Sequence, residues 1–134
     1  MKYKQIIIEE KEFELLKNGL TTAQNNSDRN YNLSIRRLKK ELLSAKIVPI
    51  NDIPEDVIRM NSTVTVQMRT NIIREFTIVP PEKSNLDQNK LSVLSPMGLA
   101  LLGYATNDTI LWQFPDGETT ITILQVTQSY NYSH

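Results

Sequence analysis

Residues 91–103 read Leu-Ser-Val-Leu-Ser-Pro-Met-Gly-Leu-Ala-Leu-Leu-Gly and combine a strand, a capped helix start and a helix stop. Ser95 suits the N-cap position, where its hydroxyl accepts a hydrogen bond from an unpaired amide of the first helical turn. Pro96 suits the first helical position, which needs no amide donor, and Gly103 marks the helix end. The helix between them is largely apolar, so we expect it to lie on a core while its Ser-Pro start stays at the surface.

Alternating apolar and polar residues predict strands on both sides of this helix. Val64, Val66 and Met68 alternate with polar residues, and Pro115-Asp116-Gly117 has the composition of a tight turn between two later strands. We therefore expect an antiparallel sheet of about five strands covered by one short helix, which is an α+β fold. The strands predicted by this pattern are residues 64–68, 72–79, 91–94, 109–114 and 118–127.

The N-terminal part has helical periodicity instead. Phe13, Leu16 and Leu20 follow one helical spacing, and a second set repeats it further along the chain, at Ile35, Leu38, Leu42 and Ala45. Residues 21–32 between them are rich in Thr, Asn and Ser, so we expect an antiparallel helical hairpin. Asn18-Gly19 is a helix-stop signal inside the first helix, although the apolar pattern continues past it. The expected organisation is a hairpin at 1–48, a connector at 49–61 and a sheet domain at 62–134.

Composition narrows the class of protein. The 134 residues contain 40% hydrophobic residues, 15 basic and 15 acidic side chains, and no cysteine. A neutral chain has no overall field that favours nucleic acid, and the lack of cysteine fits a reducing compartment. The N-terminal apolar run of three residues is too short for a signal peptide or a membrane span. We expect a cytoplasmic monomer with no membrane contact and no sequence-specific nucleic acid binding.

A search for catalytic groups identifies no candidate. His134 is the single histidine and the last residue, which disfavours a histidine triad or a zinc site. The acidic residues near Asp52 and Asp56 fit helix capping, and the basic run at 36–40 fits a solvated helix face. No glycine-rich phosphate loop is present in the sequence. We therefore predict no catalytic residue, no metal site and no cofactor, and a binding module rather than an enzyme.

The sequence from 91 to 117 resembles the C-terminal domain of the GreA/GreB transcript cleavage factors. The resemblance rests on residues 91–103, on Asn107-Asp-Thr-Ile-Leu-Trp112 and on Phe114-Pro-Asp-Gly117. Ile53-Pro-Glu-Asp-Val-Ile-Arg-Met-Asn-Ser62 is similar to the entry into this domain in the Rnk branch, the regulators of nucleoside diphosphate kinase. The resemblance covers residues 53–127 and implies an FKBP-like domain.

The resemblance also implies a partner, bacterial RNA polymerase, bound at the rim of its secondary channel. In the family the docking loop includes the Ser-Pro element, which here is Ser95 and Pro96 with Met97 adjacent. Family members that stimulate cleavage carry two acidic residues at the tip of a long coiled coil, whereas this loop has Asp28 beside Arg29. One carboxylate supplies half the ligands of such a metal site. We therefore expect polymerase binding without stimulation of transcript cleavage.

Two alternatives of other classes remain open at this stage. The implied fold suggests an FKBP-like prolyl isomerase by analogy alone, although the sequence specifies no aromatic-walled pocket. A self-associating module is the second alternative, in which the helices of two copies pair through Leu16, Leu38 and Leu42. Direct action on DNA is disfavoured by the zero net charge. The sequence leaves the sign of the effect on transcription and its targets undetermined.

Overall fold

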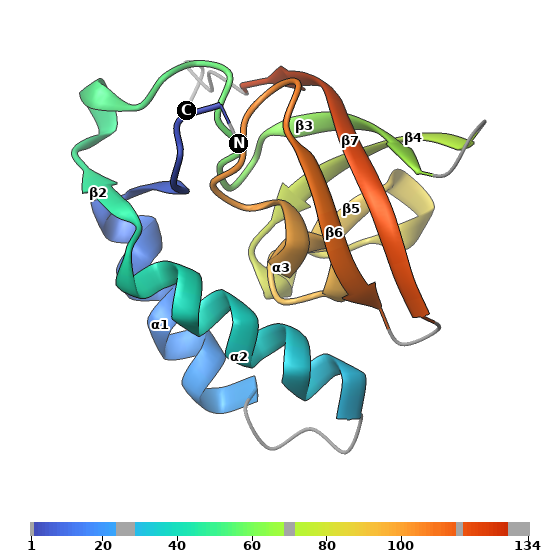
Figure 1. Ribbon diagram of the computed structural model, residues 1–134, viewed down its shortest axis with the longest axis horizontal. Helices are drawn as coiled ribbons and strands as arrows, with labels where there is room; N and C mark the ends of the chain where they lie inside the picture. The colour runs from blue at the N-terminus through green and yellow to red at the C-terminus, as the bar shows by residue number, and fades with distance from the viewer. Residues whose placement is uncertain (1, 24–28, 69–71, 115–116, 129–134) are drawn as a thin grey trace.

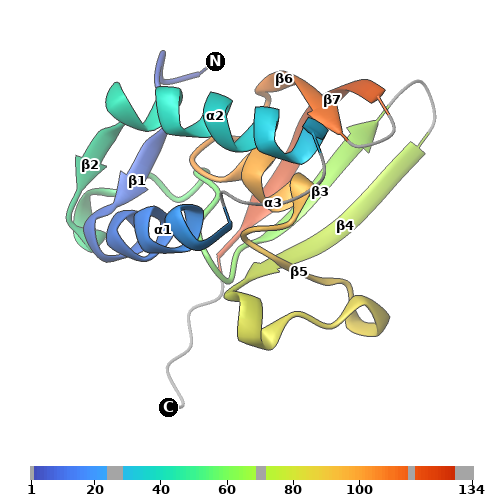
Figure 2. The same ribbon diagram turned by 90° about the horizontal axis from the view of Figure 1, so that it is seen from below.

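The structure, a computed structural model, describes residues 2–23, 29–68, 72–114 and 117–128. These residues form an α+β fold with three α-helices and a five-stranded sheet (Figure 1). Helices α1 and α2 lie on one side of the sheet, and the short helix α3 lies next to α2 and the sheet (Figure 2). The helices are α1 (Glu10–Ala23), α2 (Arg29–Leu43) and α3 (Pro96–Leu101).

The sheet has the strand order β5-β4-β3-β7-β6. Neighbouring strands are antiparallel except for β4 and β5, which are parallel. The predicted sheet is thus confirmed in its number of strands, with β5 as the departure from an antiparallel arrangement. Residues 80–89 explain it, because two short 3-10 turns carry the chain back along β4 before β5 begins. The strands are β3 (Thr63–Met68), β4 (Ile72–Val79), β5 (Lys90–Ser92), β6 (Thr109–Phe114) and β7 (Gly117–Thr127).

A second, two-stranded sheet joins the ends of the helical segment. Strand β1 (Ile7–Glu9) precedes α1 and strand β2 (Lys46–Val48) follows α2, and the two run parallel with Ile8 beside Ile47. The backbone amide of Ile7 also donates to the carbonyl of Gly103, at 3.1 Å. The sequence does not predict these strands, because three residues are too few for a periodic pattern. The pairing of β1 with β2 holds the start of α1 next to the end of α2, and the hydrogen bond to Gly103 holds both beside the segment that follows α3.

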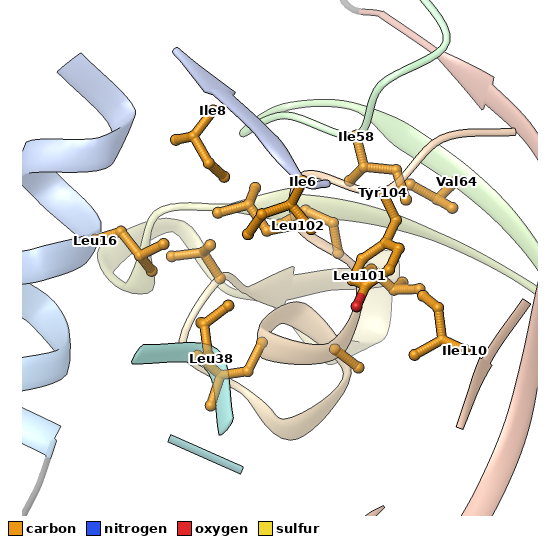
Figure 3. Close-up of a cluster of buried hydrophobic side chains, with 14 of the residues drawn as sticks. Ile6, Ile8, Leu16, Leu38, Ile58, Val64, Leu101, Leu102, Tyr104 and Ile110 are labelled. Atoms are coloured by element: carbon orange, nitrogen blue, oxygen red, sulfur yellow. The ribbon is translucent and has the colours of Figure 1, made fainter. Parts of the chain in front are cut away.

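One hydrophobic core is shared by the helices and the sheet (Figure 3). Leu16 and Leu38 are 1% and 0% exposed and point from α1 and α2 toward α3 and the sheet. Leu20, Ile35 and Leu42 belong to the same cluster. The self-association hypothesis requires two copies to pair through three of these side chains, Leu16, Leu38 and Leu42. They are buried within the chain, so that version of self-association has no exposed side chains to use.

Candidate partner-docking site

Serine hydroxyls and one carbonyl build a rigid turn at the start of α3. Ser95 is the N-cap, and its hydroxyl accepts from the amide of Gly98 at 3.1 Å. The same hydroxyl donates to the carbonyl of Ser92 at 2.7 Å, and the hydroxyl of Ser92 accepts from the amide of Leu94 at 3.0 Å. Pro96 takes the first helical position. The predicted cap is therefore confirmed, and Ser92 is a second anchor that the sequence analysis does not single out.

Glycines set how closely α3 approaches its surroundings. A Cβ on Gly98 would lie 2.4 Å from the carbonyl oxygen of Ser92 and 2.8 Å from that of Val93, both backbone atoms. Gly103 follows the C-cap residue Leu102 and has a φ of 87°, a left-handed conformation that favours glycine. The helix stop predicted at Gly103 is confirmed. Only a residue without a side chain lets α3 sit this tightly on the preceding turn.

Ser95, Pro96 and Met97 are each partly exposed. Met97 also packs against the core with part of its side chain, as does Leu94. Leu94 further lies against Gly19 of α1, where a Cβ would come within 3.1 Å of its side chain. The residue that precedes the candidate docking residues thus lies against α1, and α3 itself packs against α2 and β6. Helix α1 continues past the Asn18-Gly19 stop signal to Ala23.

The chemistry of the turn is that of a neutral contact surface. Residues 91–103 contain no charged side chain. The turn therefore offers a partner the apolar surface of Pro96 and Met97 beside serine hydroxyls already used in the internal network. Such a surface supplies shape and apolar contact to a partner.

Polar contacts join the two long helices to the segment before β3 and to the residue that follows Gly103. Glu12 of α1 accepts from the guanidinium of Arg59 at 2.9 Å and from the amide of Met60 at 3.1 Å. Glu41 of α2 accepts from the hydroxyl of Tyr104, with both carboxylate oxygens at 2.9 Å. Burial raises the pKa of Glu12, although the Met60 amide and Arg59 act against it, and burial likewise raises the pKa of Glu41. Burial and the nearby charge of Glu41 raise the pKa of Tyr104.

The second set of predicted site residues is Asp28 and Arg29, expected at the tip of the helical hairpin. Asp28 lies outside the described residues, and Arg29 is the first residue of α2, with its side chain not described. Within the described ranges no group of three or more His, Cys, Asp or Glu side chains could hold a metal ion. In the same part of the chain, no helix is long and apolar enough to span a membrane.

Comparison with protein families gives the class of the protein. A family model for the C-terminal domain of the transcription elongation factors GreA/GreB matches residues 53–128, more than half of the chain. The chain is 37% identical over 84 residues to the regulator of nucleoside diphosphate kinase of Escherichia coli (strain K12), which covers 62% of each protein. It is 36% identical over 95 residues to transcription elongation factor GreA of Alkaliphilus oremlandii, covering 70% of this chain and 60% of that protein.

A solved structure is similar over nearly the whole chain. The structure is similar to a prokaryotic transcription elongation factor GreA/GreB from Nitrosomonas europaea, with a TM-score of 0.71 and 33% identity. That match covers 92% of this chain and 99% of the other. The chain belongs to the GreA/GreB transcription elongation factor family, and the resemblance found in its sequence is confirmed. It spans less than two thirds of the length of the two curated relatives.

Proposed function

We propose that this chain is a transcription regulator that binds bacterial RNA polymerase at the secondary channel, with Ser95, Pro96 and Met97 at the contact. The observation that carries the proposal is the turn from Ser92 to Gly98, which is internally hydrogen-bonded, uncharged and partly exposed. This turn lies within the residues matched by the family model. The relatives named as transcription elongation factors support polymerase as the partner.

The proposal includes the absence of cleavage stimulation. Helices α1 and α2 contain 14 and 15 residues, and a helix of that length spans roughly 21–23 Å. Both helices pack on the core of the sheet, which further limits how far their joined ends extend from it. The sequence between the two helices offers a single carboxylate, Asp28, for a metal ion held by the polymerase. Binding would occupy the channel entrance and modulate elongation.

The domain arrangement is part of the same proposal. Residues 62–134 form the docking domain, and its relation to FKBP-like folds is supported by a five-stranded sheet with α3 packed against it. Residues 1–48 form the helical hairpin and residues 49–61 the connector. The cytoplasmic location expected from the sequence follows from the proposed partner.

Co-elution with core RNA polymerase tests the docking residues. The wild-type chain is expected to co-elute, and Ser95→Ala combined with Pro96→Ala is expected to abolish or strongly weaken binding. Ser44→Ala combined with Pro49→Ala is a matched control, because it makes the same chemical changes at two exposed positions outside the turn. Loss of the Ser95 cap costs about 1 kcal/mol, so melting curves must show that the docking variant is folded. Equal binding by both double variants would overturn the docking assignment.

Transcript cleavage on a stalled elongation complex tests the second half of the proposal. The chain is expected to bind the complex and leave the cleavage rate at its intrinsic level. Stimulated cleavage would contradict the argument from the single carboxylate. In a separate assay on a short proline peptide, the expected result is the uncatalysed isomerisation rate, and faster turnover would favour the prolyl isomerase alternative.

A further inference from the structure

An apolar surface follows α1 and the segment from the end of α2 to β2. We define it as the Phe13 surface, made of Phe13, Leu15, Leu43 and Ile47. Leu43 is 89% exposed, Leu15 is 59% exposed and Ile47 is 38% exposed. Two hollows adjoin at Phe13, one of about 670 Å³ and one of about 380 Å³. Contiguous apolar exposure of this kind marks an interaction surface, whereas single exposed apolar residues do not.

The two hollows carry opposite charge. The larger hollow is lined by two glutamates and one lysine, and the smaller one is lined by two lysines. The ammonium of Lys17 lies 5.2 Å from the centre of the Phe13 ring, so a positive charge adjoins the apolar centre directly. The Phe13 surface therefore has an acidic side and a basic side. The charged residues are Glu10, Lys11 and Glu14 in the larger hollow, and Lys17 and Lys39 in the smaller one.

We propose that the Phe13 surface is an interface between two copies of this chain, related by a two-fold axis close to Phe13. Such an axis turns the surface around, so the acidic side of one copy faces the basic side of the other. The same rotation sets Leu15 and Ile47 of one copy against Leu43 of the other, away from water. Because both contacts are made twice, each charge pairing and each apolar contact contributes double.

Charge complementarity selects a second copy as the occupant. A partner with a charge of one sign would be attracted by one side of the surface and repelled by the other. A second copy presents both signs in the order that the two-fold axis requires. The chain has equal numbers of basic and acidic side chains, so two copies approach without long-range repulsion.

This interface differs from both expectations drawn from the sequence. The sequence predicts a monomer, and the self-association alternative uses Leu16, Leu38 and Leu42, which are buried in the single chain. The exposure of Leu15 and Leu43 depends on how the helices pack on the sheet, which the sequence does not show. The inference does not rest on the proposed polymerase contact, because none of the Phe13 surface residues belongs to the Ser92–Gly98 turn.

Sedimentation equilibrium across a concentration series tests the interface. The wild-type chain is expected to show a reversible dimer, and Leu43→Glu is expected to raise the dimer dissociation constant at least about tenfold. Leu86→Glu is the matched control, because Leu86 is 75% exposed in the 3-10 turn at Leu86–Gln88, outside the Phe13 surface. A wild-type chain that stays monomeric throughout, or equal effects of the two substitutions, would overturn the proposal.

Charge reversal distinguishes a second copy from every other occupant. One variant carries Glu10→Lys and Glu14→Lys, and the other carries Lys17→Glu and Lys39→Glu, so each places like charges across its own interface. Each variant alone is expected to be monomeric, and an equal mixture is expected to form a heterodimer, because one partner is then basic where the other is acidic. A mixture that stays monomeric while the wild type dimerises would refute the two-fold arrangement.

Discussion

Tyr104→Phe tests how firmly α2 is fixed to the sheet side of the molecule. The substitution keeps the ring, which is 5% exposed, and removes the hydroxyl that donates to Glu41. No cavity forms, so the cost is that of a hydrogen bond to a partly buried charged group, about 1.5–3 kcal/mol. Arg37 remains beside Glu41 after the substitution, with its Nε 3.9 Å from the carboxylate. Thermal unfolding should show a melting temperature lower by roughly 5–10 °C.

A double-mutant cycle with Glu41→Gln isolates the pair from other effects. The amide still accepts from Tyr104 but carries no charge, so we expect a coupling free energy of about 1–2 kcal/mol between the two positions. Tyr3→Phe is the matched control, because Tyr3 is only partly buried and donates to Asp56 at 2.8 Å. If Tyr104→Phe changes stability by less than about 0.5 kcal/mol and the cycle shows no coupling, α2 is not held by this contact.

The pH dependence of the same variants gives a second measurement. The pKa of Tyr104 is raised above its ordinary value of 10.0 in the folded chain, so the stability it contributes is full below that pH. This contribution is lost as the pH rises above 10.0, because the unfolded chain then loses the phenolic proton more readily. The wild type should therefore lose stability in this alkaline range more steeply than Tyr104→Phe. Parallel pH profiles would contradict the assignment.

Three further substitutions probe the docking turn and α1. Gly98→Ala brings a Cβ against two backbone carbonyls and should lower the free energy of unfolding by about 1–3 kcal/mol, only partly offset by the better helix propensity of alanine. Gly19→Ala is the comparison, because its Cβ meets only the flexible Leu94 side chain. Denaturant unfolding should show that Gly19→Ala is neutral or stabilising. Glu12→Gln should destabilise the chain more at acidic than at neutral pH. The pKa of Glu12 is raised above 4.5 in the folded chain, so its contribution to the free energy of unfolding is full below pH 4.5 and becomes smaller as the pH rises. Chemical unfolding at several pH values measures this difference.

Local signals made part of this structure predictable. The cap at Ser95 and Pro96 depends on residues within one turn, and the strands at 72–79 and 109–114 have the bounds that their alternation predicts. The signals at the end of the first helix conflicted, because Asn18-Gly19 is a stop signal and the apolar pattern continues past it; the helix in fact ends at Ala23. Gly19 lies inside the helix against the side chain of Leu94, which is distant in sequence, and a one-dimensional pattern cannot distinguish such a glycine from one that ends a helix.

Contacts between distant residues could not be predicted in the same way. The pairing of β1 with β2 joins residues almost forty positions apart, and the contact of Glu12 with Arg59 spans 47 positions. Neither has a periodic signal, because each depends on how the helices come to rest on the sheet. The same limit applies to the candidate site. Its capping residues were visible in the sequence, whereas its neighbour α1 and the anchor Ser92 were not.

The packing of the helices bears directly on function. Five apolar side chains of α1 and α2 are buried in the shared core, and each contributes about 1.5–3 kcal/mol relative to exposure. Lifting both helices away from the sheet would therefore cost on the order of 10 kcal/mol, which is similar to the whole stability of a typical domain. Polymerase binding would have to supply that free energy for the helices to extend as an independent arm. It follows that the helices should stay on the sheet when the chain binds, which favours a regulator that covers the channel entrance over one that reaches the catalytic metal.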